Sequence, residues 1–257
     1  MCVVALAWHA HPRWQLVVAA NRDELHARPA APIARWAQSN HVIGGVDLKS
    51  GGSWLGISEE GRFVAVTNLR GFGDPQPDRV SRGALVADML AGEGPFADPS
   101  KADLAVFNPF NLIAATPDGA AFCTNRPRST HSVLGPGAYG LSNGALDQPW
   151  PKTTQLKASL LGWLVGGAEE PEALLDALRS ETLPEFGVPV SEPSDVPQEP
   201  TNTPIFIHNP VYGTRCSTVV AIDRDGSGTI IERRFDADGE PIGQSSIAFS
   251  WPSAPDG

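Results

Sequence analysis

The 257-residue sequence has few cysteines, and they lie far apart. The three are Cys2, Cys123 and Cys216. Such a small and scattered set excludes a disulfide framework and a closed structural zinc site, because both need several closely placed thiols. Of six histidines only His9 and His11 are near each other, and the following Pro12 indicates that they belong to a turn. We therefore expect reduced thiols, no metal site and no required cofactor.

Positive charge and long apolar runs are also scarce. The chain carries 19 Lys and Arg against 29 Asp and Glu, a net charge of −10, and its pI is near 5.0. Phosphate backbones and anionic membrane surfaces would repel such a chain, so we expect no nucleic-acid partner. No apolar run approaches the roughly 20 residues that span a bilayer, and no positively charged leader precedes the first apolar segment. We therefore expect a cytoplasmic protein without a membrane span.

What is present is the composition of a globular protein, with 41% hydrophobic and 19% charged residues. The length suits one domain over residues 1–257. Alternating apolar segments between Gly, Pro and Asn turns predict strands, and spaced leucines predict helices. The expected strands cover residues 2–8, 14–20, 41–47, 54–58, 62–68, 110–115, 119–123, 217–222 and 229–235. The expected helices begin after Ser81, near residue 156 and at Pro171.

The first two strands predict a hairpin that surrounds one thiol with polar groups. If Trp8 lies opposite Trp14, Cys2 faces Ala20, and residues 21–23 stand just beyond it. Strands advance about 3.3 Å per residue and lie about 4.8 Å apart, so an amide, a guanidinium and a carboxylate can reach the thiol.

The second position in the chain gives Cys2 a chemical advantage. Removal of Met1, which is normal before a residue as small as cysteine, leaves an α-amine with a pKa of about 7.7–8.0 beside a thiol of about 8.5. Nucleophile and proton acceptor then belong to one residue. Arg22 would hold the thiolate or a substrate carboxylate, and Asp23 would orient the amine. The alternatives are that Cys2 is a small buried apolar side chain and that residues 22–24 form a solvated ion-pair network.

Three polar residues farther along the chain are further candidates. Asn68 ends an expected strand, where its amide can donate to an oxyanion or cap a turn. Asn143 is a second oxyanion or substrate-binding candidate, although Asn-Gly is also a common turn dipeptide. Arg215 enters a strand and either binds a substrate anion or pairs with a surface carboxylate.

Two segments are expected to lack regular structure. Residues 26–32 contain two prolines and predict a loop leaving the site, because proline removes a backbone donor. Residues 184–204 combine six prolines with four acids and predict an extended acidic loop, which is either a lid or an insertion.

Together, several motifs resemble the NRDE family, also called the transport and Golgi organisation family. The motifs are Met1-Cys2, Asn21-Arg22-Asp23-Glu24, Gly51-Gly52-Ser53-Trp54-Leu55-Gly56, Thr67-Asn68, Phe110-Asn111-Leu112-Ile113-Ala114-Ala115, Tyr139-Gly140-Leu141-Ser142-Asn143 and Tyr212-Gly213-Thr214-Arg215. The resemblance runs in register over most of the chain. It implies an α+β N-terminal-nucleophile hydrolase-like fold, a four-layer αββα sandwich of two antiparallel sheets.

The resemblance also implies roles for residues. It is similar to the branch containing penicillin V acylases and bile-salt hydrolases, which use an N-terminal cysteine, arginine, aspartate and asparagines. The matching catalytic candidates are Cys2, Arg22, Asp23, Asn68 and Asn143, and the substrate-binding candidates are Asn21 and Arg215. One departure is that Arg22 and Asp23 are adjacent here, so they point to opposite faces of a strand.

Two hypotheses follow for function. The first is hydrolysis of a non-peptide amide bond in a small acyl substrate by the Cys2 thiolate. The second, implied by relatives associated with haem trafficking and membrane-lipid or Golgi organisation, is a carrier of haem or another small ligand that uses the same pocket without catalysis. Haem is then a possible ligand, with a residue such as Cys2 on the iron.

Overall fold

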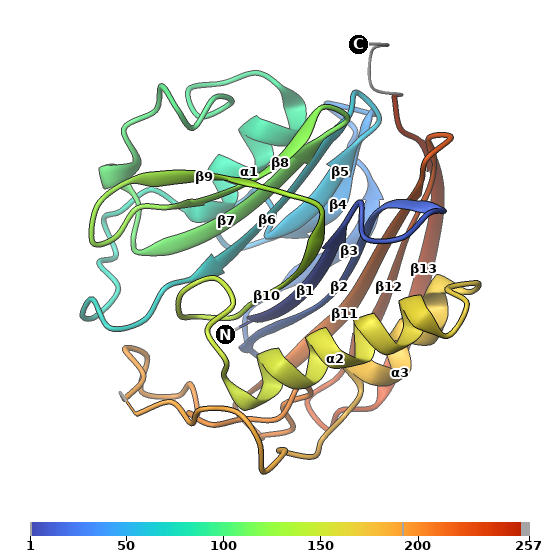
Figure 1. Cartoon of the computed structure of the whole chain (residues 1–257). Helices are drawn as coiled ribbons and strands as arrows, with labels where there is room; N and C mark the ends of the chain where they lie inside the picture. The colour runs from blue at the N-terminus through green and yellow to red at the C-terminus, as the bar shows by residue number, and fades with distance from the viewer. Residues whose placement is uncertain (1, 192, 253–257) are drawn as a thin grey trace.

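The computed structural model describes residues 2–191 and 193–252 and consists of two antiparallel sheets packed face to face (Figure 1). Within these residues, sheet A has six strands and sheet B has seven. The order in sheet A is β10 (Gly137–Leu141), β1 (Cys2–Trp8), β2 (Trp14–Leu25), β11 (Tyr212–Asp223), β12 (Ser227–Phe235) and β13 (Pro241–Ser250). The order in sheet B is β3 (Ala30–Arg35), β4 (Val42–Asp47), β5 (Leu55–Ser58), β6 (Arg62–Asn68), β7 (Phe110–Thr116), β8 (Gly119–Thr124) and β9 (Thr130–Leu134).

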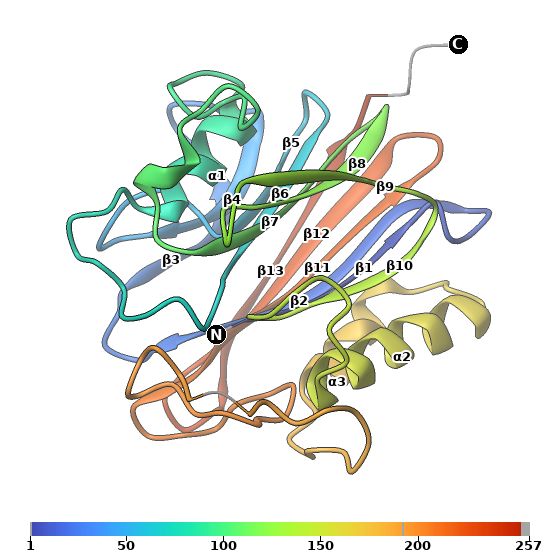
Figure 2. The ribbon, with the colours of Figure 1, turned by 60° about the vertical axis from the view of Figure 1, so that its left-hand side comes forward.

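Helices cover the outer face of each sheet, which confirms the predicted four-layer αββα arrangement (Figure 2). Helix α1 (Arg82–Ala91) packs on sheet B, and α2 (Pro151–Val165) and α3 (Leu174–Leu178) pack on sheet A. Two short 3-10 helices are η1 (Leu104–Val106) and η2 (Pro171–Ala173). As predicted, Ser81 caps α1 by accepting from the Gly83 N–H, and Gly92 ends the helix in the left-handed conformation.

Strand alternation sorts the apolar side chains into separate layers. In β1, Val4 and Leu6 point between the two sheets, whereas Val3 and Ala5 point toward α2 and α3. Successive residues of a strand face opposite sides. The same rule, carried into residues 21–24 of β2, sends neighbouring charged residues to different layers.

The predicted hairpin forms, but its predicted register is wrong by two residues. Cys2 pairs with Arg22 rather than Ala20, and Trp8 pairs with Leu16. The turn is longer than expected, and it is closed by the His9 N–H donating to the Gln15 carbonyl at 2.8 Å. An even shift leaves every side chain on its predicted face. It also moves the charged residues inside β2, directly opposite the thiol.

Residues 30–35 correct the loop predicted over 26–32. They form β3 at the edge of sheet B, and the ladder shifts register between Ala31 and Ala34. Pro32 lies within this irregularity, and an edge strand with a shifted ladder accommodates a residue that cannot donate. Strands β9, β10 and β13 were also not predicted.

Residues 184–191 and 193–204 contain no helix or strand, as predicted. Among the described residues, no helix is both long enough and apolar enough to cross a membrane.

Candidate active site

A pocket of about 500 Å³ lies at one end of the space between the sheets. Val4 and Ala20 are the last members of the apolar filling in β1 and β2, and Cys2 and Arg22 take their place in the next pair. The wall therefore changes from hydrocarbon to polar atoms within one step along the two strands. Asn68 at the end of β6 and Arg82 at the start of α1 also line the pocket.

Register places a row of four reactive or charged side chains along sheet A. Cys2 pairs with Arg22, Arg22 pairs with Cys216, and Cys216 pairs with Arg234. Directly paired residues point to the same face of a sheet. Thiol and guanidinium groups therefore alternate along one pocket wall, over three strand spacings of about 4.8 Å each.

The main chain of Cys2 is held by the two residues that follow β10, Ser142 and Asn143. Its nitrogen donates to Asn143 Oδ1 at 3.4 Å, and its carbonyl accepts from Ser142 Oγ at 2.7 Å. Burial raises the pKa of the Cys2 thiol, and the Asp23 carboxylate adds to this rise, while Arg22 works against it. The thiol is therefore protonated near neutral pH, and nucleophilic attack requires a nearby proton acceptor.

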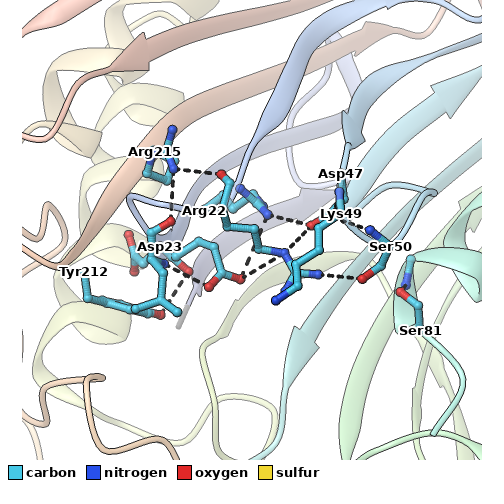
Figure 3. A network of polar contacts seen from close by, with 12 residues as sticks. Arg22, Asp23, Asp47, Lys49, Ser50, Ser81, Tyr212 and Arg215 are labelled. Atoms are coloured by element: carbon cyan, nitrogen blue, oxygen red, sulfur yellow. Dashed lines mark hydrogen bonds and ion pairs between the residues drawn. The ribbon is translucent and has the colours of Figure 1, made fainter. Parts of the chain in front are cut away.

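Arg22 belongs to a network that crosses from sheet A to sheet B (Figure 3). Its Nη2 lies 3.1 Å from Asp47 Oδ2, and Arg28 Nε contacts the same oxygen at 2.6 Å. Burial alone would raise the pKa of Asp47, but the hydrogen bond from Arg28 and the nearby positive charges hold that pKa below its usual value. Arg22 Nη1 is buried without a protein hydrogen-bond partner among the described residues, so a donor remains for a ligand.

Asp23 points to the other face of β2, toward the helices. Its Oδ1 accepts from Thr214 Oγ1 at 2.7 Å, and its backbone carbonyl accepts from the Tyr212 hydroxyl at 2.9 Å. Lys152 Nζ lies 3.9 Å from Asp23 Oδ2. Burial raises the pKa of the Asp23 carboxyl to about 6, despite the opposing charge of Lys152. The charges of Arg22 and Asp23 thus both influence the Cys2 thiol, from opposite faces of β2.

The two predicted asparagines differ in availability. Asn68 lines the pocket, and its side chain makes no hydrogen bond to the described residues, so its amide is available to an oxyanion. Asn143 is fully buried and does not line this pocket; its Nδ2 donates to the Asn68 carbonyl at 2.8 Å. Asn143 therefore connects the main chains of Cys2 and Asn68.

The predicted substrate-binding residues are also separated. Asn21 lies on the helix side of β2, where its Nδ2 donates to the carbonyls of Leu178 and Ile205 at 2.8 and 3.0 Å. The structure does not bring it into the pocket. Arg215 lines the pocket, but its Nη1 donates to three carbonyls in residues 25–28. Arg215 Nε is buried without a hydrogen-bond partner in the described chain.

Sequence reasoning missed four charged residues around Cys2: Arg70, Arg82, Lys152 and Glu199. Arg70 and Glu199 form a buried ion pair with an Nη2–Oε1 distance of 2.8 Å. A signal existed for Lys152, because a lysine in the first turn of a helix opposes the helix dipole. No local signal distinguishes Glu199 from the other acids of its loop.

The pocket is more cationic than the chain as a whole. The described residues that line it include seven cations and four acids. The cations are Arg22, Arg28, Lys49, Arg79, Arg82, Arg215 and Arg234, and the acids are Asp23, Glu24, Asp47 and Glu232. This excess of positive charge, in a chain of net charge −10, favours an anionic ligand. No group of three or more His, Cys, Asp or Glu side chains in the described part of the chain is arranged to hold a metal ion.

Known proteins resemble this chain in both sequence and fold. A family model described as Transport and Golgi organisation 2 matches residues 1–237. The Transport and Golgi organization protein 2 homolog of Bos taurus is 34% identical over 258 residues, covering 91% of this chain and 92% of that protein. Its Homo sapiens counterpart is 33% identical with the same coverage.

The solved C2A mutant of conjugated bile acid hydrolase from Clostridium perfringens superimposes with a TM-score of 0.53 at 8% identity, covering 96% of this chain and 92% of that one. The fold is therefore that of the N-terminal-nucleophile hydrolases. The family model spans most of the sequence, and two relatives above 30% identity cover nearly all of it. The chain belongs to the Transport and Golgi organisation 2 family.

Proposed function

We propose that this chain is a cysteine N-terminal-nucleophile amidohydrolase that cleaves the non-peptide C–N bond of a small acyl substrate carrying an anionic group. The observation that carries the proposal is the place of Cys2. Its thiol lines a polar pocket at the start of β1, with Arg22 directly opposite and the free amide of Asn68 in the same pocket.

The proposed reaction begins once Met1, which lies outside the described residues, has been removed. The α-amine of Cys2 takes the thiol proton, and the thiolate attacks the substrate carbonyl. Asn68 donates to the resulting oxyanion. The C–N bond breaks as the α-ammonium protonates the leaving amine, which gives a thioester. Water then attacks the thioester and returns its proton through the α-amine, so that the carboxylic acid leaves and the thiol is restored.

Residues around Cys2 have supporting parts in this scheme. Asn143 Oδ1 is 3.4 Å from the nitrogen that becomes the α-amine, so it accepts one of that amine's protons. Asp23 supplies the negative charge that stabilises and orients the ammonium form. Arg22 lowers the pKa of the Cys2 thiol, although burial dominates that pKa.

The charge of the pocket supports an anionic substrate. Arg82 makes a single hydrogen bond, from Nη1 to the Pro109 carbonyl at 3.0 Å, and has no ion pair within the described residues. A carboxylate or phosphate on the substrate would provide the missing partner. Arg215 remains the predicted second contact. Support for the reaction class comes from the bile acid hydrolase of similar fold, whose name states a hydrolase and whose C2A mutant replaces a cysteine that is numbered 2 in its own chain.

The test combines intact mass with turnover. We expect the purified protein to lack Met1 and to hydrolyse members of a panel of N-acyl amino acids. Cys2→Ala should lower kcat/KM by at least about 10³-fold, because it removes the nucleophile. Cys123→Ala is the matched control, since Cys123 packs between sheet B and α1. Retention of Met1, or equal turnover by Cys2→Ala, would contradict the proposal.

The carrier alternative uses the same features differently. A thiol could ligate haem iron, and the arginines of the pocket could pair with the propionate carboxylates. This alternative predicts a saturable shift of the Soret band on titration with haemin and no turnover of any amide. Absence of saturable binding would dispose of it.

A further inference from the structure

Lys152 occupies an electrostatically unfavourable position. It is the second residue of α2, and only 3% of its surface is exposed. A cation in the first turn faces the positive end of the helix dipole, and a buried ammonium also loses its hydration. Burial accordingly lowers the pKa of Lys152. Such a placement persists only where neighbouring groups offset both costs.

The offsetting groups come from elements that also surround Cys2. Lys152 Nζ lies 3.9 Å from Asp23 Oδ2 on β2 and 3.3 Å from Thr203 Oγ1. The negative charges of Asp23 and Glu199 raise the pKa of Lys152, against the larger effect of burial. Glu199 is itself paired with Arg70. Among the residues that the structure describes, the acids Asp23 and Glu199 and the cations Lys152 and Arg70 thus form one buried cluster behind Cys2.

The cluster determines the charge of Asp23. The Asp23 side chain is fully shielded from solvent, and burial raises its pKa to about 6. Among the described residues, Lys152 lowers this pKa most and the hydroxyl of Thr214 lowers it further, whereas the charge of Glu199 raises it. The Cys2 thiol is another titratable group that Asp23 influences. Without the Lys152 charge, the carboxyl would lose its largest compensation for burial.

We infer that Lys152 is a positioning residue for the proposed reaction: its ion pair keeps Asp23 ionised in the closed interior, so that this carboxylate can hold the α-ammonium of Cys2. The inference rests on the proposed function for the use made of Asp23, but the ion pair itself can be tested without any substrate. Lys152 does not line the pocket, so we assign its effect on the reaction to its ion pair with Asp23 and not to contact with a substrate.

The direct experiment is a titration of Asp23 by NMR. Protein labelled with ¹³C at the aspartate carboxyl carbons is followed against pH, and Asp23→Asn assigns the resonance. We expect a pKa of about 6 for Asp23 in the wild type. Lys152→Met should raise the Asp23 pKa by about one to two units, the usual effect of losing an opposite charge at this distance. Lys152→Arg keeps the charge and should restore a near-wild-type titration.

Lys157→Met is the matched control. Lys157 lies on the same helix and forms an ion pair of 2.7 Å with Asp147, but it is partly exposed. Its replacement should leave the Asp23 titration unchanged. A folded Lys152→Met protein in which Asp23 titrates as in the wild type would overturn the inference.

A second variant covers the case in which Lys152→Met is too unstable to titrate. The double variant Lys152→Met/Asp23→Asn removes both charges, so it should be more stable than Lys152→Met alone. A double variant that is no more stable than the single one also overturns the inference.

Activity provides the remaining readout. In Lys152→Met, the acid limb of the pH dependence of kcat should move to higher pH by the same shift of about one to two pH units. The KM should change little. If the wild type hydrolyses no amide, the proposed function fails and the titration still decides the role of Lys152. If amides are hydrolysed but Asp23 titrates identically in Lys152→Met, only the inference fails.

Discussion

The two faces of β2 place similar charges in opposite surroundings. On the face toward sheet B, Arg22 contacts Asp47 in a network that borders the pocket, and the Glu24 side chain beside it remains 27% exposed. On the face toward the helices, the side chains of Asp23 and Lys152 are 0% and 3% exposed. Each pair joins a residue of β2 to an opposite charge on another element, but both members of the Arg22–Asp47 pair line the pocket, whereas the Asp23–Lys152 pair is buried and Lys152 does not line the pocket.

The difference shows that exposure to solvent determines how much an ion pair contributes to stability. Breaking an ion pair near water lowers the free energy of unfolding only slightly, because solvent replaces the lost partner. A buried pair that loses one member leaves an unscreened charge, which is costly. The pocket face can therefore exchange partners with a substrate, whereas the helix face holds a fixed charge pattern behind Cys2.

The largest expected effect tests this contrast through stability. Glu199→Gln breaks the buried pair with Arg70 and should lower the free energy of unfolding by about 3–5 kcal/mol. Glu24→Gln, on the pocket face, should lower it by less than about 1 kcal/mol. Urea unfolding of both variants measures the difference. Equal losses would show that the two faces are not distinct in the way described.

The second prediction sharpens the contrast through pH. The folded pKa of Asp23 is raised to about 6, so its contribution to stability is full below the unfolded pKa and is lost as pH rises through about 6. Relative to Asp23→Asn, the wild type should lose up to about 3 kcal/mol of unfolding free energy between about pH 4 and pH 7.

Asp47 should show the opposite sign, which makes it the control. Its folded pKa is lowered, because the Arg28 hydrogen bond and nearby charges outweigh burial, so its contribution is present above the unfolded pKa and is lost as pH falls. The unfolding free energy of the wild type minus that of Asp47→Asn should therefore become more positive as pH rises. Slopes of the same sign for Asp23 and Asp47 are the result that conflicts with this account.

The smallest predicted effect concerns the pocket face and its ligand. Arg82→Gln should lower kcat/KM for an amide with a carboxylate by about tenfold, because one charge-assisted hydrogen bond is lost. The matching amide with a carboxamide in place of the carboxylate should be affected little. Arg62→Gln, whose side chain pairs with Glu60 away from the pocket, is the control. A tenfold loss of kcat/KM for both amides would mean that Arg82 does not recognise the negative charge of the substrate.

Local signals in the sequence predicted much of the fold. The Ser81 cap and Gly92 bounded α1, and alternating apolar residues located most strands, because these features depend on neighbours along the chain. The register of the first hairpin failed because it depends on the turn, and the turn is two residues longer than assumed. Strand β3 was missed because Pro32 argues against a ladder that an edge strand nevertheless forms.

In the candidate site, too, local features were predicted from the sequence and contacts between distant segments were not. Strand alternation predicted that Arg22 and Asp23 would face opposite sides, and they do. The surroundings of Asp23 could not be predicted, because Lys152 and Glu199 reach it from a helix and a loop distant in the sequence. Those charges come together only in the folded chain, and their spacing along the sequence does not predict that they are neighbours.

The proline-rich stretch has a consequence for anyone who would redesign this scaffold. Residues 193–204 join the body through Asp195, which accepts from the Gly71 N–H at 2.9 Å, and through the buried Glu199. Deleting this stretch would leave Arg70 and Lys152 as neighbouring cations without their shared counterion. Tags and insertions therefore belong at exposed hairpin tips such as Asp118, whereas this irregular segment has to keep its length.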